Sequence, residues 1–194
     1  MPLKLITAGG GSVILDANST ASTYTVNVPA QGGAMLTSAS GLNATNMTSG
    51  TLPTARLPSG SVLQVVSAVS TSLVTTTSGS YVSTGFSASI TPTSSSSKIL
   101  ILLNASMQGS GNGGFGFNLY RGGSSILVDG QPYSAAYWVY GNNWRTKTPL
   151  MYLDSPATTS STTYTLYYAS YNGITVYLCT ENSPSTMTLL EIAA

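Results

Sequence analysis

The stretch YSAAYWVYGNNWR holds the side chains of this sequence that are best suited to bind another molecule. Six of its thirteen positions are aromatic residues or arginine: Tyr133, Tyr137, Trp138, Tyr140, Trp144 and Arg145. Aromatic rings stack on the faces of sugar rings, and Tyr, Trp and Arg dominate the hot spots of protein interfaces. The chemistry that this stretch suggests is contact with a glycan or a receptor.

The same stretch also fits packing within the protein. Tyr137 and Val139 alternate with Trp138 and Tyr140, as in a strand whose two faces fill a subunit interface and a sandwich core. Trp138 stands in this strand-like run, and we expect it to pack. Trp144 follows GNN, which marks a loop, and we expect it to be exposed.

Acid–base and metal chemistry find little support. The sequence has no histidine, which removes the commonest general base. Its carboxylates are scattered without the spacing of metal ligands: Asp16, Asp129, Asp154, Glu181 and Glu191. A glycosidase pair of Asp129 with Asp154 or Glu181 is one hypothesis, and turn-capping or surface carboxylates are the other. We expect no catalytic residue, no cofactor and no metal site, and therefore no enzyme.

The stretch GSGNGGFG, residues 109–116, superficially resembles a phosphate-binding loop. It lacks the Lys-Ser/Thr that would follow, and no helix pattern comes after it to supply a dipole. We interpret it as a hairpin or inter-strand loop.

The residues from Ser61 to Ala194 read as a series of short strands. Ten runs separated by turn signals carry this pattern: VLQVVSAV, YVSTGFSASITP, KILILLNASM, FGFNLYRG, SILVDG, AAYWVYG, TPLMYLD, TYTLYYASY, ITVYLCT and MTLLEIAA. In TYTLYYASY, for example, Tyr164, Leu166 and Tyr168 share one face. The pattern predicts an all-β chain with very little helix, whose C-terminal part is a β-sandwich or jelly roll.

An extended arm precedes this predicted head. Residues 1–36 hold two strand-like runs, Ser12–Ala17 and Tyr24–Ala30, which we interpret as two strands or a small hairpin. Residues 37–60 form a connector in which Pro53 and Pro58 favour extended backbone. Because the arm cannot bury a core of its own, we expect it to dock on another protein or to intertwine with sister chains.

The composition indicates a subunit of an assembly. Charged residues make up 6% of the chain, against about 25% in an average globular protein, and the net charge is +1. Such a balance does not favour nucleic acid, and no apolar run is long enough to insert into a membrane. Exposed strands usually carry charges that prevent edge-to-edge association, and they are scarce here. Cys179, the lone cysteine, lies in a strand-like run, and we expect a buried thiol.

Several stretches resemble virion proteins of tailed bacteriophages. AGGGSVILDANSTASTYTVNVPAQGGAML is similar to the opening module of phage fibre proteins, and GLNATNMTSGTLPTARLP to a connector that recurs in them. GFSASITPTSSSSKILILLNASM and the stretches that follow, to STMTLLEIAA, resemble a phage head domain similar to the trimeric jelly rolls of the C1q and tumour-necrosis-factor type. The resemblance implies a structural protein on the virion surface, assembled in the host bacterial cytoplasm and usually a homotrimer.

Three functions remain open on these residues. The first is a short trimeric tail fibre, in which residues 1–36 dock on other virion proteins, of the tail or baseplate, and residues 61–194 bind the host surface. The second is a capsid decoration or cement protein that stabilises the phage head by contacting the major capsid protein. The third, a polysaccharide hydrolase, is disfavoured by the missing acid–base groups.

Overall fold

The computed structural model describes residues 3–6, 12–15, 57–128, 130–139 and 143–194, and the chain divides into two units, Met1–Gly50 and Thr51–Ala194. In the first unit, β1 (Leu3–Ile6) pairs antiparallel with β2 (Ser12–Leu15). The strand predicted at Ser12–Ala17 is therefore present as β2, but its partner is β1, where we expected no strand. The strand predicted at Tyr24–Ala30 and the connector up to residue 56 lie outside the described residues.

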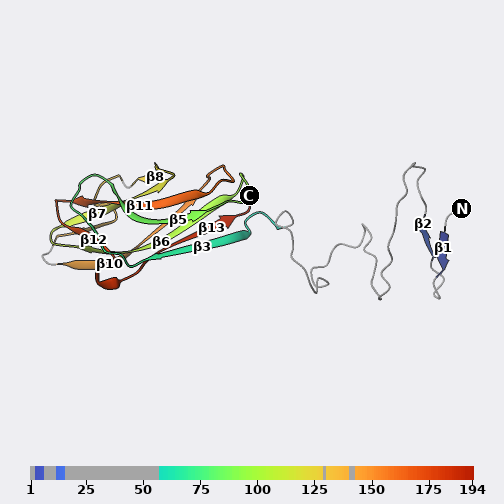
Figure 1. The fold of residues 1–194 in the computed structure, drawn as a ribbon, viewed down its shortest axis with the longest axis horizontal. Coiled ribbons are helices and arrows are strands. Elements are labelled where there is room, and N and C mark those ends of the chain that lie inside the picture. Colours follow the sequence, from blue (N-terminus) through green and yellow to red (C-terminus); the bar gives the residue numbers. More distant parts are fainter. Residues whose placement is uncertain (1–2, 7–11, 16–56, 129, 140–142) are drawn as a thin grey trace. The chain divides into compact units, whose positions relative to one another are not determined.

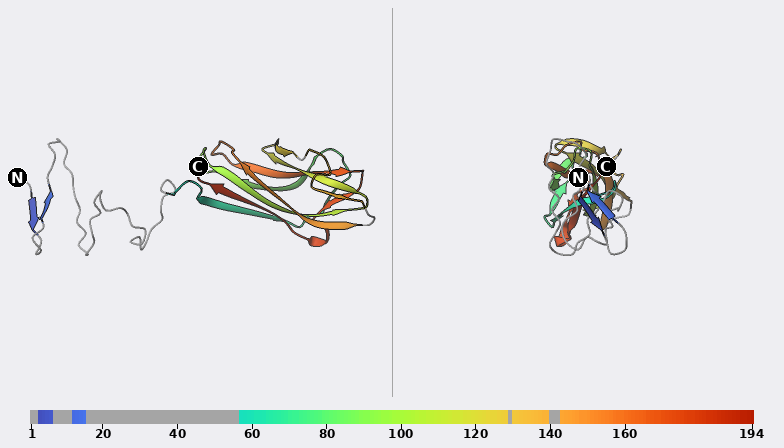
Figure 2. Two further views of the ribbon diagram at one scale, coloured as in Figure 1. Left: turned by 180° about the vertical axis from the view of Figure 1, so that it is seen from behind. Right: turned by 90° about the vertical axis from the view of Figure 1, so that its right-hand side faces the viewer.

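The second unit is a sandwich of two antiparallel sheets (Figure 1). The six-stranded sheet contains β3 (Val62–Ser70), β13 (Ser185–Ile192), β6 (Lys98–Gly109), β12 (Val176–Leu178), β4 (Val74–Thr76) and β10 (Trp144–Asp154). The five-stranded sheet contains β5 (Val82–Ile90), β11 (Thr162–Tyr171), β7 (Gly113–Arg121), β8 (Ser124–Val128) and β9 (Ala136–Trp138). The same two layers are seen from behind in Figure 2. The prediction of an all-β sandwich is confirmed.

All ten predicted strands of this unit are present, and β4 is the strand that the sequence did not reveal. It has three residues within a stretch of Ser and Thr, and it exists through its pairing with β12. The long strand β6 organises the six-stranded sheet. It pairs along one edge with β10, and along the other first with β13 and then with β12. At roughly 3.3 Å per residue, its 12 residues span about 40 Å, nearly the length of the sandwich.

The core lies between the sheets and follows from the alternation of the strands. On β11, Tyr164, Leu166 and Tyr168 are fully buried, as the period of two predicts. Ile99 and Ile101 of β6 oppose them from the other sheet, and both are fully buried as well. Other fully or nearly fully buried members are Ile90, Leu103, Met107, Phe115, Phe117, Leu119, Val176, Leu178, Met187 and Leu189. The strand pattern therefore determines which face of each element is removed from water.

Helical structure is nearly absent, as predicted. Within the described ranges, the one helical segment is the 3-10 turn Thr180–Asn182, and no helix there has the length and hydropathy needed to cross a membrane. Cys179, directly before this turn, is 1% exposed, which confirms the expected buried thiol.

Glu191 on β13 is a buried carboxylate, which nothing in the sequence pattern indicated. It is fully buried and accepts hydrogen bonds from Gln64 Nε2 at 2.6 Å and from both the amide and the hydroxyl of Thr93 at 2.7 Å. Burial acts to raise the pKa of Glu191, but the hydrogen bonds from Gln64 and Thr93 outweigh it and hold the pKa below its ordinary value of 4.5. The ionised form is therefore the one that the fold stabilises.

We expect the head to lose stability in acid through Glu191. Because its pKa is lower in the folded than in the unfolded state, its contribution is fully present above about pH 4.5 and is lost as the pH falls through the folded value. Glu191→Gln should lower the free energy of unfolding at pH 7 by about 1–3 kcal/mol. The NH2 group of the new amide would face the donors of Gln64 and Thr93, which now bind a carboxylate oxygen. Urea titrations between pH 3 and 7 test this, because the chain has only 5 Asp and Glu side chains and few other groups titrate in this range. An equally steep pH dependence in the variant would contradict it.

Candidate functional site

The aromatic stretch lies at the end of the sandwich opposite to the point where the chain enters it. The chain enters beside the C-terminus, where the amide of Gly60 donates to the carbonyl of Ala193 at 2.8 Å. The aromatic strand β9 pairs with the first residues of β7, at the far end of β6. In Figure 1 the C-terminus marks the first end, and β7, β12 and β10 reach the second.

Three tyrosines form one half of the aromatic surface. Tyr133, Tyr137 and Tyr171 contact one another pairwise, with ring centroids 4.6 to 5.9 Å apart and mostly edge-on geometry. Tyr133 is 39% exposed and Tyr137 is 48% exposed. Tyr171 comes from the end of β11, far along the chain, and no local signal in the sequence links it to this cluster. The cluster thus holds two half-exposed rings in place from three segments.

A stack of three rings forms the other half and runs from the core to the surface. Phe115 is fully buried and stacks on Trp144 at 5.5 Å, and Trp144 stacks in turn on Trp138 at 6.3 Å. Trp144 is 8% exposed, and its indole Nε1 donates to the carbonyl of Gly111 at 3.1 Å. Trp138 is 51% exposed. The half-exposed ring of Trp138 therefore packs on the buried ring of Trp144.

This order reverses our expectation for the two tryptophans. Trp144 was predicted to stand exposed in a loop, but it begins the long strand β10 and its ring lies in the core. Trp138 was predicted to pack, but it is half-exposed, because β9 is a three-residue strand whose one pairing in the described part of the chain is with β7. Tyr140, which we also predicted to contact a ligand, lies outside the described residues.

Glycines make room for this aromatic end. A Cβ atom on Gly114 would lie 2.4 Å from the carbonyl oxygen of Ala136, and one on Gly109 would lie 2.5 Å from the indole of Trp144. Gly113 and Gly116 are equally crowded by backbone atoms. These residues belong to β6 and β7, so the stretch 109–116 is mostly strand, with the turn confined to its middle. The inter-strand turn that we expected here therefore joins β6 to β7 and is shorter than the whole stretch. The flanking glycines allow close approach of neighbouring segments.

Arg145 does not join the aromatic surface. It is the neighbour of buried Trp144 on β10, and alternation sends its side chain to the outer face of the six-stranded sheet. Its Nε donates to Gln108 Oε1 at 2.9 Å, and its two terminal nitrogens bind both carboxylate oxygens of Glu181. The structure therefore places two aromatic groups at this end of the head, Tyr133 with Tyr137 on one face of β9 and Trp138 with Trp144 on the other, which together we call the aromatic surface. Arg145 lies elsewhere.

The predicted carboxylates have structural partners where the structure describes them. Asp154 is 6% exposed and binds Arg121 and Tyr164, so it is not at the surface. Glu181 pairs with Arg145, and Asp129 lies outside the described residues. No group of three or more Asp, Glu, Cys or His side chains suited to a metal ion occurs in the part of the chain that the structure describes.

Comparison with known proteins does not show to which family the chain belongs. No family model matches it, and no curated protein matches it. Among solved structures, it is similar to a chain from the structure of infectious bursal disease virus, Gx strain, with 16% identity and a TM-score of 0.33. The match covers 71% of this chain and 37% of the viral chain. A likeness this distant carries no argument about function.

Proposed function

We propose that this chain is a structural virion protein, a short trimeric phage fibre that docks through its N-terminal arm and presents its sandwich heads to the host surface. The resemblance of the connector and opening module to phage fibres supports this proposal. The observation that carries it is that the point of chain entry and the exposed aromatic rings lie at opposite ends of the head. The chain enters beside Ala193, and the exposed ring of Trp138 lies at the other end, about the length of β6 away. A head held by its arm presents that ring outward.

The aromatic surface is suited to a sugar ligand. Trp138 offers an exposed aromatic face for stacking, and the separate group of Tyr133 and Tyr137 offers rings and phenol groups for hydrogen bonding. Trp138 rests on the buried Trp144, so it needs little ordering when a ligand binds. Three copies in a trimer would add avidity to a weak single contact. Host-surface glycan is therefore the ligand class that we assign to this end.

The outer face of the six-stranded sheet supports assembly into trimers. Three cross-strand rows make up this outer sheet face: Leu153, Leu100, Leu190 and Val65; Met151, Leu102, Thr188 and Ser67; Pro149, Asn104, Thr186 and Val69. Met151 is 72% exposed and Val69 is 64% exposed in the single chain. Monomeric proteins seldom keep such an apolar patch in water. Because the rows carry no charge, copies of this face can meet without like-charge repulsion.

Sedimentation of the purified full chain tests this assignment. We expect a trimer at micromolar concentration, and we expect Leu102→Lys/Met151→Lys to yield folded monomers, because the interface would have to bury two charges. Ser87→Lys, at an exposed position on β5 of the other sheet, should remain trimeric. A wild-type monomer, or a double variant that stays trimeric, would contradict the assignment.

The number of copies per virion separates the two structural roles. A tail fibre is present in few copies, whereas very many copies on the shell would instead favour the capsid decoration role. Purified heads should compete with particles for adsorption to host cells if the fibre assignment is right. A Trp138→Ala head that competes as well as wild type would contradict the role of the aromatic surface.

A further inference from the structure

A pocket lies near the same end of the head, and it is lined by several charged residues of a chain that has few. It has a volume of about 360 Å³ and is lined by Arg145, Lys147, Glu181, Ser106, Thr180 and Ser183, among others. The whole chain has 6 Lys and Arg residues, and two of them, Arg145 and Lys147, face this one pocket from alternate positions of β10. Ligand pockets of small molecules start at about this size.

The arginine of this pocket is held ready for a planar anion. Gln108, only 7% exposed, accepts a hydrogen bond from Arg145 Nε at 2.9 Å and thereby fixes the plane of the guanidinium. The two remaining nitrogens bind Glu181 in the paired geometry that guanidinium forms with any carboxylate or phosphate. Lys147 Nζ lies on the carbonyl of Pro184 and adds a second positive charge. An acidic ligand would therefore find both cations in place.

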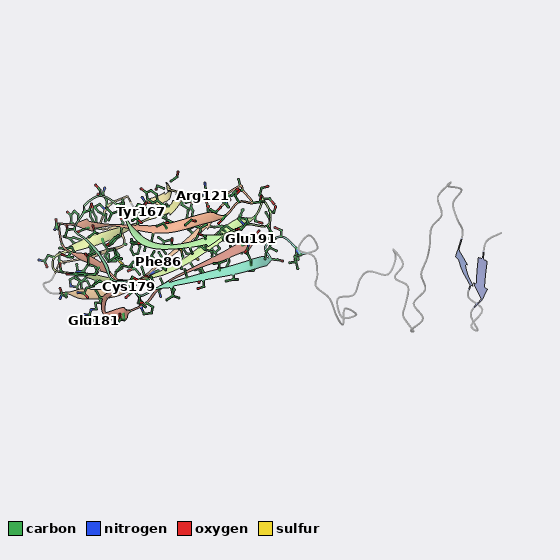
Figure 3. All side chains as sticks on the ribbon, viewed as in Figure 1. Phe86, Arg121, Tyr167, Cys179, Glu181 and Glu191 are labelled. Carbon is green, nitrogen blue, oxygen red and sulfur yellow. The ribbon has the colours of Figure 1, made fainter. Side chains whose placement is uncertain are left out.

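The acid that now occupies Arg145 sits on a strained turn. Three residues of the turn have positive φ angles, which residues other than glycine rarely adopt. They are Cys179 at 59°, Glu181 at 53° and Asn182 at 57°. Cys179 anchors the turn, since its amide donates to the carbonyl of Ser106 at 2.8 Å, and both Cys179 and Glu181 are labelled in Figure 3. The Glu181 side chain is 69% exposed and that of Arg145 is 53% exposed. Exposed ion pairs add little stability, so stability does not explain why the turn is strained at this pair.

We propose that this pocket binds the acidic group of a charged saccharide, with Glu181 as the group that the ligand displaces from Arg145. The ligand's carboxylate or phosphate takes the two guanidinium nitrogens and approaches Lys147, while Thr180 and Ser183 offer hydroxyls to the sugar. Glu181 guards the pocket against neutral sugars, because only an anion gains enough from Arg145 to replace it. The inference deepens the proposed function by adding an acid-specific contact, and it does not depend on the aromatic surface.

Calorimetric titration of the full-length protein tests the pocket. Tetragalacturonate and glucose 1-phosphate are the two acidic probes, which separate carboxylate from phosphate ligands, and maltotetraose is the neutral control. We expect Arg145-dependent binding of at least one acidic probe, and no Arg145-dependent binding of maltotetraose. Arg145→Gln should weaken that binding about tenfold or more, and Lys147→Gln should weaken it less. Glu181→Gln should strengthen it several-fold, because the competitor for Arg145 is neutralised.

Lys98→Gln is the matched control, since it removes one exposed positive charge at the opposite end of β6. It should leave binding unchanged. The proposal is overturned if neither acidic probe binds to wild type or Glu181→Gln, if Lys98→Gln costs as much as Arg145→Gln, or if Glu181→Gln binds more weakly than wild type. Sedimentation of the same samples reports the trimer separately, so failure of the pocket is distinguishable from failure of the proposed assembly.

Discussion

Replacing Trp144 by alanine is expected to lower the free energy of unfolding of the head by about 3–5 kcal/mol. The indole is 8% exposed, stacks on Phe115 and fills the space left by Gly109, and its Nε1 donates to the carbonyl of Gly111. Alanine would leave a cavity at the junction of the two sheets, together with an unpaired carbonyl. Denaturant unfolding at one fixed protein concentration measures the loss, because stability of an oligomer depends on concentration.

Trp138→Ala is the control for this prediction. Its ring is 51% exposed and packs on Trp144 from the outside, so we expect a loss of about 1 kcal/mol. The two variants remove the same type of side chain, so the difference between their expected losses of stability reflects the different burial of the two rings. Equal losses in the two variants would show that the core does not end at Trp144. Trp138→Ala is also the variant to use in adsorption experiments, since we expect it to remain folded.

Asp154→Ala is expected to lower the free energy of unfolding by about 3 kcal/mol. Asp154 on β10 belongs to one sheet, and it accepts hydrogen bonds from Arg121 at 2.8 Å and from the Tyr164 hydroxyl at 2.7 Å, both of which belong to the other. Burial, and then the hydrogen bond to Asp154, raise the pKa of Tyr164, so the hydroxyl keeps its proton and donates at every working pH. Alanine would leave the Arg121 guanidinium and the Tyr164 hydroxyl without their hydrogen-bond acceptor.

The size of this effect follows from the exposure of the pair. Breaking a buried ion pair costs about 3–5 kcal/mol, and we expect the lower end because the Arg121 side chain is 32% exposed and can be hydrated. Glu181→Ala, which breaks an exposed pair, should cost less than about 1 kcal/mol. A double-mutant cycle of Asp154→Ala with Tyr164→Phe would measure the link between the sheets, and a coupling near zero would contradict it.

The sequence by itself determined the elements of the head and the direction in which most of their side chains point. Strand alternation is a local property, so Tyr164, Leu166 and Tyr168 could be assigned to one buried face of β11 from their spacing alone. Turn residues placed nine further strands of the head in the same way. Only β4, three residues long and dependent on its pairing with β12, lacked a pattern of its own.

Only the tertiary structure decided which of two similar side chains lies in the core. Trp144 is buried because Gly109, on a strand formed 35 residues earlier, leaves the space that its ring fills, whereas Trp138 is half-exposed because the one pairing of β9 in the described part of the chain is with β7. The sequence left Asp154 open as a surface or turn-capping acid and did not mark Glu191 as buried. The fold brings the Tyr164 hydroxyl to Asp154 and the Thr93 amide to Glu191. Burial and charge pairing depend on which residues from distant parts of the chain pack against a side chain. The spacing of residues along one strand does not contain that information.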